Sequence, residues 1–534
     1  MDRKAKIAKS AGLISLATFI SRILGYIKDM ILAKYFGATG TADAFFVAFR
    51  IPNLLRELFA EGSMSSAFIP VLKEQETMKG KEEANRLVRA VFISILIFVG
   101  IICVLGIVFA PAIVSIIAPG FLKDSEKFYN TVLLTRIMFP FLLFISLASI
   151  TMGSLNVRGV FFIPALAPAL LNIVIIISVV TLSMQFINPI IAVAIGVTVG
   201  GLVQFLIQVP SFFKQGYKLR AQKSEVKQKI SGDSRFSFWH PGLKKIGVLI
   251  LPATAGMAVS QINIFISTIL ASYLEEGSIT YLYYSMRLIQ FPIGIFGVAM
   301  GMAVLPTLAE HSVKGQMDKL KDDFSFALRL LFFITVPAMV GLIALNLPIV
   351  STLFYRGEFD YRATVGTSEA LIFYSVGIWA IVGAKVITST YYSMQDTRTP
   401  VKIAASSMVI NIVFSLLLIG PMKHNGLALA NSIASGFNFL LLFYFLKGHL
   451  GGLGTKGIIR SFGKTLLASI IMGVPGWYIA KNDIWGLSGY GFEKAIYLFF
   501  SIILCIGTYL LFSYLIKNEE MGYIINKIKQ GRTK

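Results

Sequence analysis

The chain is poor in the residues that disulfide-rich scaffolds and metal sites depend on. Only 14% of its 534 residues are charged, two are cysteines and four are histidines. Cys103 and Cys505 both lie inside apolar stretches, which argues against a disulfide framework. The histidines have neither a shared helical face nor the spacing of metal ligands. The sequence therefore predicts neither of these two classes.

Catalytic and nucleotide-binding motifs are missing too. We find no carboxylate pair with room for a water, no Ser/His/Asp grouping and no glycine loop that would cradle phosphates. We therefore predict a protein that is not an enzyme, has no cofactor and binds no nucleotide. An ATP-driven pump is disfavoured, so an ion gradient, the membrane potential or the substrate gradient must drive any transport.

Acidic residues are scarce, with 27 Asp and Glu against 49 Lys and Arg, for a net charge of +22. Hydrophobic residues make up 56% of the chain. Apolar runs of about 20 residues, the length that crosses a bilayer core as a helix, recur throughout. In such a protein the positive balance reflects Lys and Arg in cytoplasmic loops rather than nucleic-acid binding. We predict an all-α polytopic membrane protein with no nucleic-acid partner.

The apolar runs define about fourteen transmembrane helices. They are predicted at 10–36, 43–75, 86–117, 128–154, 161–184, 189–214, 242–273, 278–309, 326–355, 368–393, 402–420, 425–446, 460–480 and 494–516. The loops at 73–90, 214–245 and 447–464 are strongly basic, whereas 37–42 and 185–190 carry no charge. Basic loops stay in the cytoplasm, so the basic loops mark the cytoplasmic side. With an even number of spans, both termini then lie on that side.

An internal repeat relates the two halves. FIPVLKEQ at 68–75 is echoed by VLPTLAEH at 304–311, and FVAFRIPN at 46–53 by YYSMRLIQ at 283–290. A unit of six spans thus occurs twice in parallel orientation. The predicted organisation is listed in chain order: a six-helix lobe at 1–215, a basic cytoplasmic loop at 216–241, a second lobe at 242–450, two additional helices at 451–517 and a basic cytoplasmic tail at 518–534.

Several cations lie deep inside apolar spans, where a charge is costly and by default marks a substrate path. The candidates for substrate binding are Arg22, Lys28, Arg56 and Arg287. Since these charges are positive, the expected substrate is an anion. Arginine binds phosphate as a bidentate fork and stays charged when desolvated, so several such cations suit a pyrophosphate.

Other intramembrane charges are interpreted as structural or gating groups. They are Asp29, Asp43, Arg50, Glu57, Glu61 and Lys385. Asp29 lies seven positions after Arg22, so the two side chains can pair along one helix. Asp43, Arg50 and Glu57 are also spaced by seven and can form a charge-compensated stripe. Arg56 lies off that stripe and is the preferred ligand contact.

Four segments closely resemble the MurJ/MviN family: 21–37 (SRILGYIKDMILAKYFG), 41–72, 283–309 and 391–400 (YYSMQDTRTP). The similarity runs along essentially the whole chain. It implies the multidrug/oligosaccharidyl-lipid/polysaccharide exporter fold, with two six-helix lobes in a V around a central cationic cavity plus two C-terminal helices. It also implies a bacterial inner-membrane flippase that moves lipid II, the undecaprenyl-pyrophosphate-linked peptidoglycan precursor, to the outer leaflet by alternating access.

The resemblance assigns roles by motif position. The headgroup arginines of the family correspond to Arg22, Arg56 and Arg287, and a further cavity arginine is replaced by Lys28, which keeps the charge but loses the fork. Met286 stands where many relatives have an acidic residue, which argues against a fixed ion-pair gate there. The last two helices are expected to form a groove for the lipid tail.

Two alternatives remain open. A flippase for another polyprenyl-linked oligosaccharide would share the cationic site. A cation-coupled multidrug exporter needs buried carboxylates, and the second half has none within 254–273, 279–309 or 402–419. Asn411 and nearby hydroxyls are candidates for a coupling-ion site, although such groups in helices usually join neighbouring helices. The sequence does not identify a coupling ion.

Overall fold

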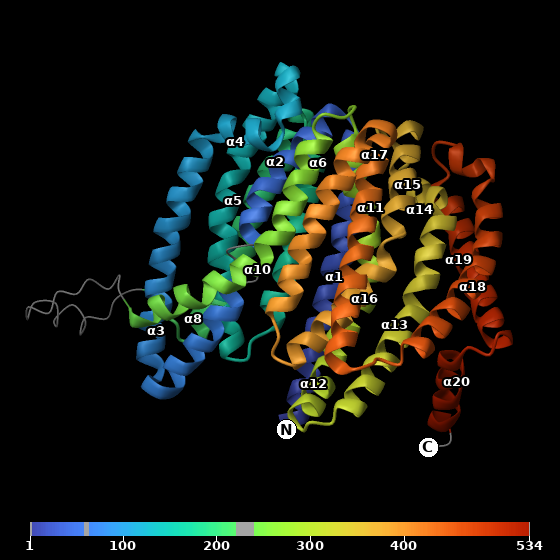
Figure 1. Cartoon of the computed structure of the whole chain (residues 1–534). Coiled ribbons are helices and arrows are strands. Elements are labelled where there is room, and N and C mark those ends of the chain that lie inside the picture. Colours follow the sequence, from blue (N-terminus) through green and yellow to red (C-terminus); the bar gives the residue numbers. More distant parts are fainter. Residues whose placement is uncertain (1–2, 58–62, 220–239, 533–534) are drawn as a thin grey trace, which may run out of the picture. The chain divides into compact units, whose positions relative to one another are not determined.

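The computed structural model describes residues 3–57, 63–219 and 240–532 (Figure 1). The described chain is built of helices, with a lone β-bridge between Arg356 and Phe359. It divides into two compact units. Unit 1 comprises Met1–Leu32 and Gly40–Ile262, and unit 2 comprises Ala33–Thr39 and Asn263–Lys534. The division falls within a continuous helix, and the predicted lobe boundaries at 215, 241 and 450 stay predictions.

Unit 1 holds the first half of the helices. In chain order they are α1 (Arg3–Phe36, its end belonging to unit 2), α2 (Gly40–Arg56), α3 (Ser63–Val108), α4 (Ala110–Ile117), η2 (Pro119–Lys123), α5 (Ser125–Val157), α6 (Phe162–Leu182), η3 (Ser183–Gln185), α7 (Ile191–Leu206), α8 (Val209–Lys214) and the first part of α10 (Pro241–Ala271).

Unit 2 continues from the second part of α10. Its remaining elements are α11 (Ser278–Pro292), η4 (Ile293–Val298), α12 (Ala299–Val313), α13 (Met317–Ala344), α14 (Asn346–Phe354), α15 (Tyr361–Ser375), α16 (Ile378–Ser393), α17 (Arg398–Leu450), α18 (Thr455–Ala480), η5 (Asp483–Gly486), α19 (Gly491–Leu515) and α20 (Glu519–Arg532).

Nine helices of the described chain are long and apolar enough to cross a membrane, or ten if α15 and α16, bent by 41°, form one span. Within the described ranges, each predicted segment nevertheless falls mainly on helices, and residues 58–62 of the segment 43–75 lie outside those ranges. The lower number arises partly because α17 contains two predicted segments in 53 continuous residues. Three further predicted segments lie on α1, α2 and α10, which are not among the helices that meet the length and composition criterion.

Two long helices are broken where the sequence predicted loops. In α3 the backbone of Gly80 has φ 88° and ψ 177°, a conformation open to glycine. In α17 the break is at Lys423, with φ 50° and ψ −131°, directly after Pro421 and Met422. The breaks fall between the predicted segments that end at 75 and 420 and those that follow. Each helix therefore turns where its hydrophobic pattern is interrupted.

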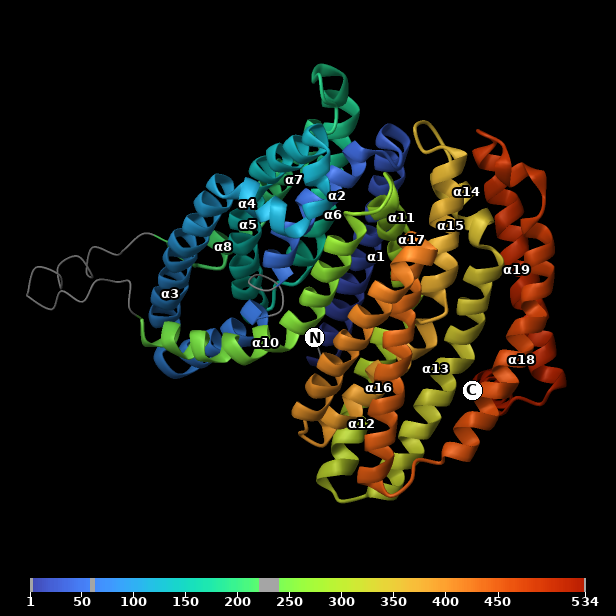
Figure 2. The same cartoon turned by 45° about the horizontal axis from the view of Figure 1, so that its top comes forward.

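The core of unit 1 forms where α3 packs along α5, as both views show (Figure 2). Phe68, Leu72 and Leu87 of α3 are fully buried in this core against Ile150 of α5. Apolar α3 and α5 surfaces approach closely because Gly106 leaves room for the Phe139 ring. These contacts form the rigid frame that holds α2 beside α5.

The two additional C-terminal helices belong to the core of unit 2. Met472 of α18 and Tyr509 of α19 pack with Phe333 of α13, and the Tyr509 hydroxyl donates to the Phe333 carbonyl over 2.6 Å. The predicted basic tail contains the helix α20, which the sequence analysis did not anticipate. Glu519 of α20 forms a 2.6 Å ion pair with Arg329 of α13.

Candidate anion-binding residues

Arg56, at the end of α2, is held by a polar network. Its Nε donates to Asn53 Oδ1 over 3.0 Å, and Asn53 Nδ2 donates to Glu57 Oε1 over 3.1 Å. The Arg56 guanidinium lies 4.0 Å from the Glu57 carboxylate, and Gln261 of α10 donates to the other oxygen of Glu57. The side chain of Arg56 is 22% exposed. The network fixes the direction of the guanidinium on its Nε side while the group keeps access to its surroundings.

Pro52 explains why this network forms at the end of α2. A proline inside a helix removes one backbone hydrogen bond and disturbs the preceding turn. Asn53 follows Pro52 directly and finds polar neighbours in Arg56 and Glu57. Asn53, Arg56 and Glu57 lie on adjacent turns, so their side chains meet at a spacing of three or four residues.

Arg22 is exposed on α1. The possible pair between Arg22 and Asp29 is not formed, and no ion pair joins Arg22 to any side chain in the described ranges. Next to it, Asn172 of α6 donates to the Ser21 carbonyl over 3.3 Å. This contact ties α6 to α1 beside the arginine.

Lys28 pairs with its neighbour Asp29. The ammonium is 3.0 Å from Asp29 Oδ1, and the side chains are 12% and 0% exposed. Asp29 therefore neutralises part of the charge that the sequence analysis assigned to the substrate. A lysine in this state is a weaker anion ligand than Arg22, because its carboxylate neighbour competes for it.

Asp43 forms an ion pair across helices. It is 1% exposed and lies 3.0 Å from the ammonium of Lys127 on α5, which also sits 4.3 Å from the ring centre of Phe121. The spacing of seven residues predicted a stripe of Asp43 and Arg50 along α2, and Lys127 lies outside that pattern. Arg50 is half-buried on α2. A structural role for Asp43 is consistent with this geometry.

Arg287 lies in unit 2, half-buried on α11 with Met286 beside it. The next turn ends at Pro292, and the π-helical segment η4 follows. Two residues earlier, Ser285 donates to the carbonyls of Tyr281 and Thr367 and so fixes α11 against α15. This region of α11 is thus anchored immediately before the arginine.

The remaining predicted residues have different outcomes. Lys385 lies half-buried on α16 beside a cavity, while Asn411 donates to Asn263 Oδ1 over 2.5 Å. An amide pair of this kind joins helices, as sequence reasoning favoured. Glu61 lies outside the described residues. Within the described residues no group of three or more His, Cys, Asp or Glu side chains is arranged to hold a metal ion.

The structure places Arg22, Lys28 and Arg56 in unit 1 and Arg287 in unit 2. That they act on one substrate stays a prediction. Sequence reasoning missed Gln261, which donates to Glu57 in the Arg56 network, and Lys127, which pairs with Asp43. In the sequence, Gln261 stands out as a polar residue in an apolar helix, and Lys127 as a lysine in the first turn of a span.

Comparisons with known proteins were made for the whole chain. The profile of the family described as "Lipid II flippase MurJ" matches residues 32–496. A "Probable lipid II flippase MurJ" of Haemophilus influenzae is 36% identical over 92% of this chain and 96% of its own length. The "Lipid II flippase MurJ" of Burkholderia cenocepacia is 33% identical over 88% of this chain and 90% of its own length.

The solved structures agree with the fold. A structure titled "Lipid II flippase MurJ, inward closed conformation" superposes with a TM-score of 0.76 at 30% identity, covering 95% of this chain and 99% of its own. An inward-facing multidrug resistance MATE transporter reaches a TM-score of 0.65 at 16% identity over 81% of this chain and 96% of its own. The second match shows the fold alone. The predicted all-α polytopic fold and the resemblance noted in the sequence are confirmed.

Proposed function

Because the chain belongs to the MurJ lipid II flippase family, we propose that it translocates lipid II, the undecaprenyl-pyrophosphate-linked peptidoglycan precursor, from the cytoplasmic to the outer leaflet. The protein is a multi-pass transport protein of the bacterial inner membrane. Relatives carrying the flippase name span nearly the whole chain. The transport step thus supplies precursor for cell-wall synthesis.

The observation that carries the proposal is the held guanidinium of Arg56. A cation in an apolar helix is costly, and here Asn53 and Glu57 orient it. A pre-oriented guanidinium loses little rotamer freedom when it binds. It is therefore suited to a pyrophosphate, whose oxygens match the paired donors of arginine.

Arg22 and Arg287 complete the proposed headgroup site. Both occupy the family's arginine positions in the motifs at 21–37 and 283–309. Lys28 is proposed as an accessory contact, because Asp29 holds its ammonium at 3.0 Å. The substrate pyrophosphate would replace the hydration shells of these cations, while the polyprenyl tail stays in lipid.

Alternating access is the proposed mode of transport. The chain has two units, each with its own core, and both α1 and α10 continue from one unit into the other. Binding of the pyrophosphate would stabilise one arrangement of the units, and its release the other. We propose cytoplasmic termini, since the loops at 73–90 and 447–464 are rich in Lys and Arg.

Growth of a flippase-depleted host tests the assignment. We expect wild-type protein to restore growth and Arg56→Ala to abolish complementation, because removal of the cation leaves the pyrophosphate charge uncompensated. Arg56→Lys should complement poorly, because lysine keeps the charge without the fork. Protein amounts in the membrane are measured in parallel.

The matched control is Arg86→Ala, which removes an exposed arginine paired with Glu83 at 3.5 Å on α3. It should complement fully. Full complementation by Arg22→Ala, Arg56→Ala and Arg287→Ala alike would contradict the proposed site. Growth restored by this chain in a host that lacks a flippase for another polyprenyl-linked sugar, together with its failure in the lipid II flippase-depleted host, would instead favour that alternative.

A further inference from the structure

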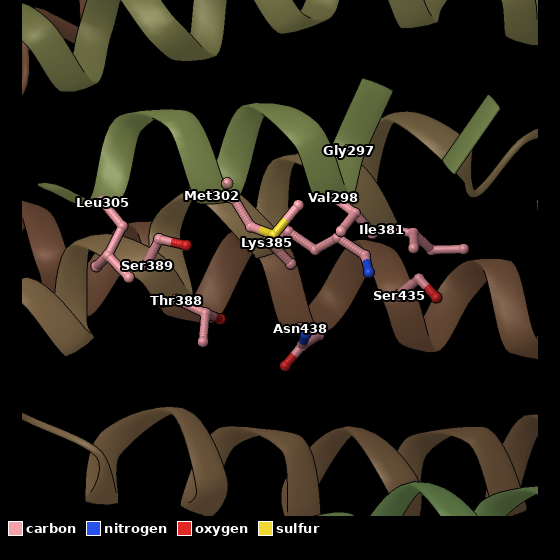
Figure 3. A pocket seen from close by; sticks show the side chains of 12 residues that line it. Gly297, Val298, Met302, Leu305, Ile381, Lys385, Thr388, Ser389, Ser435 and Asn438 are labelled. Atoms are coloured by element: carbon pink, nitrogen blue, oxygen red, sulfur yellow. The ribbon is translucent and has the colours of Figure 1, made fainter. Parts of the chain in front are cut away.

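A cavity of about 470 Å³ lies inside unit 2, apart from the arginines discussed above. It is lined by η4 and α12, by α16, and by the second half of α17. Its polar side chains are Lys385, Thr388, Ser389, Ser435 and Asn438 (Figure 3). Ligand sites of this size usually combine apolar walls with a few such groups.

Lys385 is the only charged side chain among the cavity residues in the described chain. It lies eight residues before Ser393, the end of α16, or about 12 Å at 1.5 Å per residue. Figure 3 shows its nitrogen turned toward Ser435 of α17. Asn438 follows Ser435 by three residues on α17 and also lines the cavity. No hydrogen bond or ion pair joins the ammonium to another residue of the described ranges.

The cavity offers donors and is short of anionic acceptors. Asn438 Oδ1 already accepts from Ser407 over 3.3 Å, so its amide NH2 remains a donor. The Ser435 hydroxyl donates to the Asn431 carbonyl over 2.8 Å. α16 and α17 contain no acidic residue, and α12 contains only Glu310, beyond the cavity. A half-buried ammonium in such surroundings requires an anion or water.

The opposite wall is apolar. Val298, Met302 and Leu305 line it along η4 and α12. α12 approaches α16 closely because Gly297 and Gly301 lack side chains: a Cβ on Gly301 would lie 3.3 Å from Ser389 Oγ, and one on Gly297 would lie 3.5 Å from the Lys385 stem. The cavity therefore combines a cationic, hydroxyl-bearing side with a hydrocarbon side.

We propose that this cavity is a second lipid-anion site, in which Lys385 binds the phosphate of a lipid headgroup. Thr388, Ser389 and the Asn438 amide donate to the phosphate oxygens, and the hydrocarbon chain lies on Val298, Met302 and Leu305. Basic cavities between transmembrane helices are suited to anionic lipid headgroups. The phosphate belongs either to a resident phospholipid or to a polyprenyl pyrophosphate. The site contains none of the proposed headgroup arginines, so it does not depend on the flippase assignment.

Lipid binding to the purified full-length protein in detergent tests the site. The probes are phosphatidylglycerol, undecaprenyl pyrophosphate and, as a neutral reference, phosphatidylcholine, and bound lipids are counted by native mass spectrometry. We expect Lys385→Met to weaken binding of one anionic probe by about tenfold, the loss typical of a charged hydrogen-bond partner. Lys385→Arg should restore binding, and Ser389→Ala should weaken it less.

The matched control is Lys402→Met, which removes an exposed lysine at the start of α17. It should bind as the wild type does, and thermal unfolding identifies any variant that is misfolded. A loss confined to phosphatidylglycerol assigns the site to a membrane phospholipid, and one confined to undecaprenyl pyrophosphate assigns it to the transported lipid. Unchanged binding of both anionic lipids by folded Lys385→Met, or an equal loss of phosphatidylcholine, overturns the proposal.

Discussion

At the scale of single residues, the carboxylates of Asp29, Asp43 and Glu57 in unit 1 are held by cationic or amide partners. Asp29 lies 3.0 Å from the Lys28 ammonium, and Asp43 lies 3.0 Å from Lys127. Glu57 accepts from Asn53 and from Gln261. The two ion pairs offset the negative charge of Asp29 and Asp43, and they engage Lys28 and Lys127 as the paired cations.

The Asp43–Lys127 pair gives a stability prediction. Lys127→Met leaves a carboxylate that is 1% exposed without this cation, which should destabilise the protein by about 3–5 kcal/mol. The double variant Asp43→Asn/Lys127→Met should recover part of that loss. Thermal unfolding in detergent measures both, with Lys123→Met, an exposed lysine nearby, as the control. Equal stability of Lys127→Met and Lys123→Met would show that the pair contributes little.

Sequence reasoning identifies the charged residues but not all of their partners. Arg22, Arg56 and Arg287 stand out because they interrupt apolar runs. The partner of Asp43 is 84 positions away, and Gln261 is 204 positions from Glu57. Periodicity along one helix relates only neighbours a few residues apart, so it favoured an Asp43–Arg50 stripe and missed contacts made through tertiary packing.

At the scale of helices, small residues decide how closely the long spans approach. A Cβ on Gly106 of α3 would lie 2.0 Å from the Phe139 ring of α5, whereas one on Gly100 of the same helix meets no atom within 4 Å. The first position is required for packing and the second is open. The two glycines therefore form a matched pair for an experiment.

We expect Gly106→Ala to destabilise the protein by about 1–3 kcal/mol, because Phe139 must move out of a packed core. Gly100→Ala should leave stability unchanged or raise it slightly, since alanine favours a helix. Thermal unfolding of the two variants distinguishes the outcomes. Equal unfolding temperatures would mean that α3 and α5 adjust without strain.

The start of α17 gives a prediction about pH. The Thr399 hydroxyl and the backbone N–H groups of Thr399 and Arg398 donate to the Asp396 carboxylate and lower its pKa below the ordinary value. A lowered pKa in the folded state means that the stabilisation is present above the unfolded pKa, about 3.9, and is lost as the pH falls through the folded pKa.

The difference in unfolding temperature between wild type and Asp396→Asn should therefore be largest near neutral pH and shrink below about pH 4. Thermal unfolding of both proteins across that range measures it. A difference that stays constant down to pH 3 would show that the charge of Asp396 does not support this helix start.

Helix positions were largely predictable, and helix endings were less so. Apolar runs located the spans because membrane crossing demands them. The breaks in α3 and α17 fall in predicted loops, but sequence patterns do not give the backbone conformations of Gly80 and Lys423 at those breaks. The tail helix α20 was also missed, because its docking through Arg329 is a tertiary contact.

At the scale of the whole molecule, the chain has two compact units, and the cations proposed to bind the headgroup are divided between them. Arg22 and Arg56 belong to unit 1 and Arg287 to unit 2. A substrate held by both groups would couple its binding to the arrangement of the units, as alternating access requires. Removal of cations from either unit should therefore abolish transport rather than change specificity.

The central claim is tested most directly by measuring which leaflet holds lipid II in cells that depend on this protein. A membrane-impermeant enzyme that cleaves lipid II is added to flippase-depleted cells, and the cleaved fraction is quantified with and without a membrane potential. We predict that wild-type protein restores cleavage in energised cells and that Arg56→Ala, at equal abundance, does not. Equal cleavage with Arg56→Ala, or in cells lacking the protein, would contradict the account.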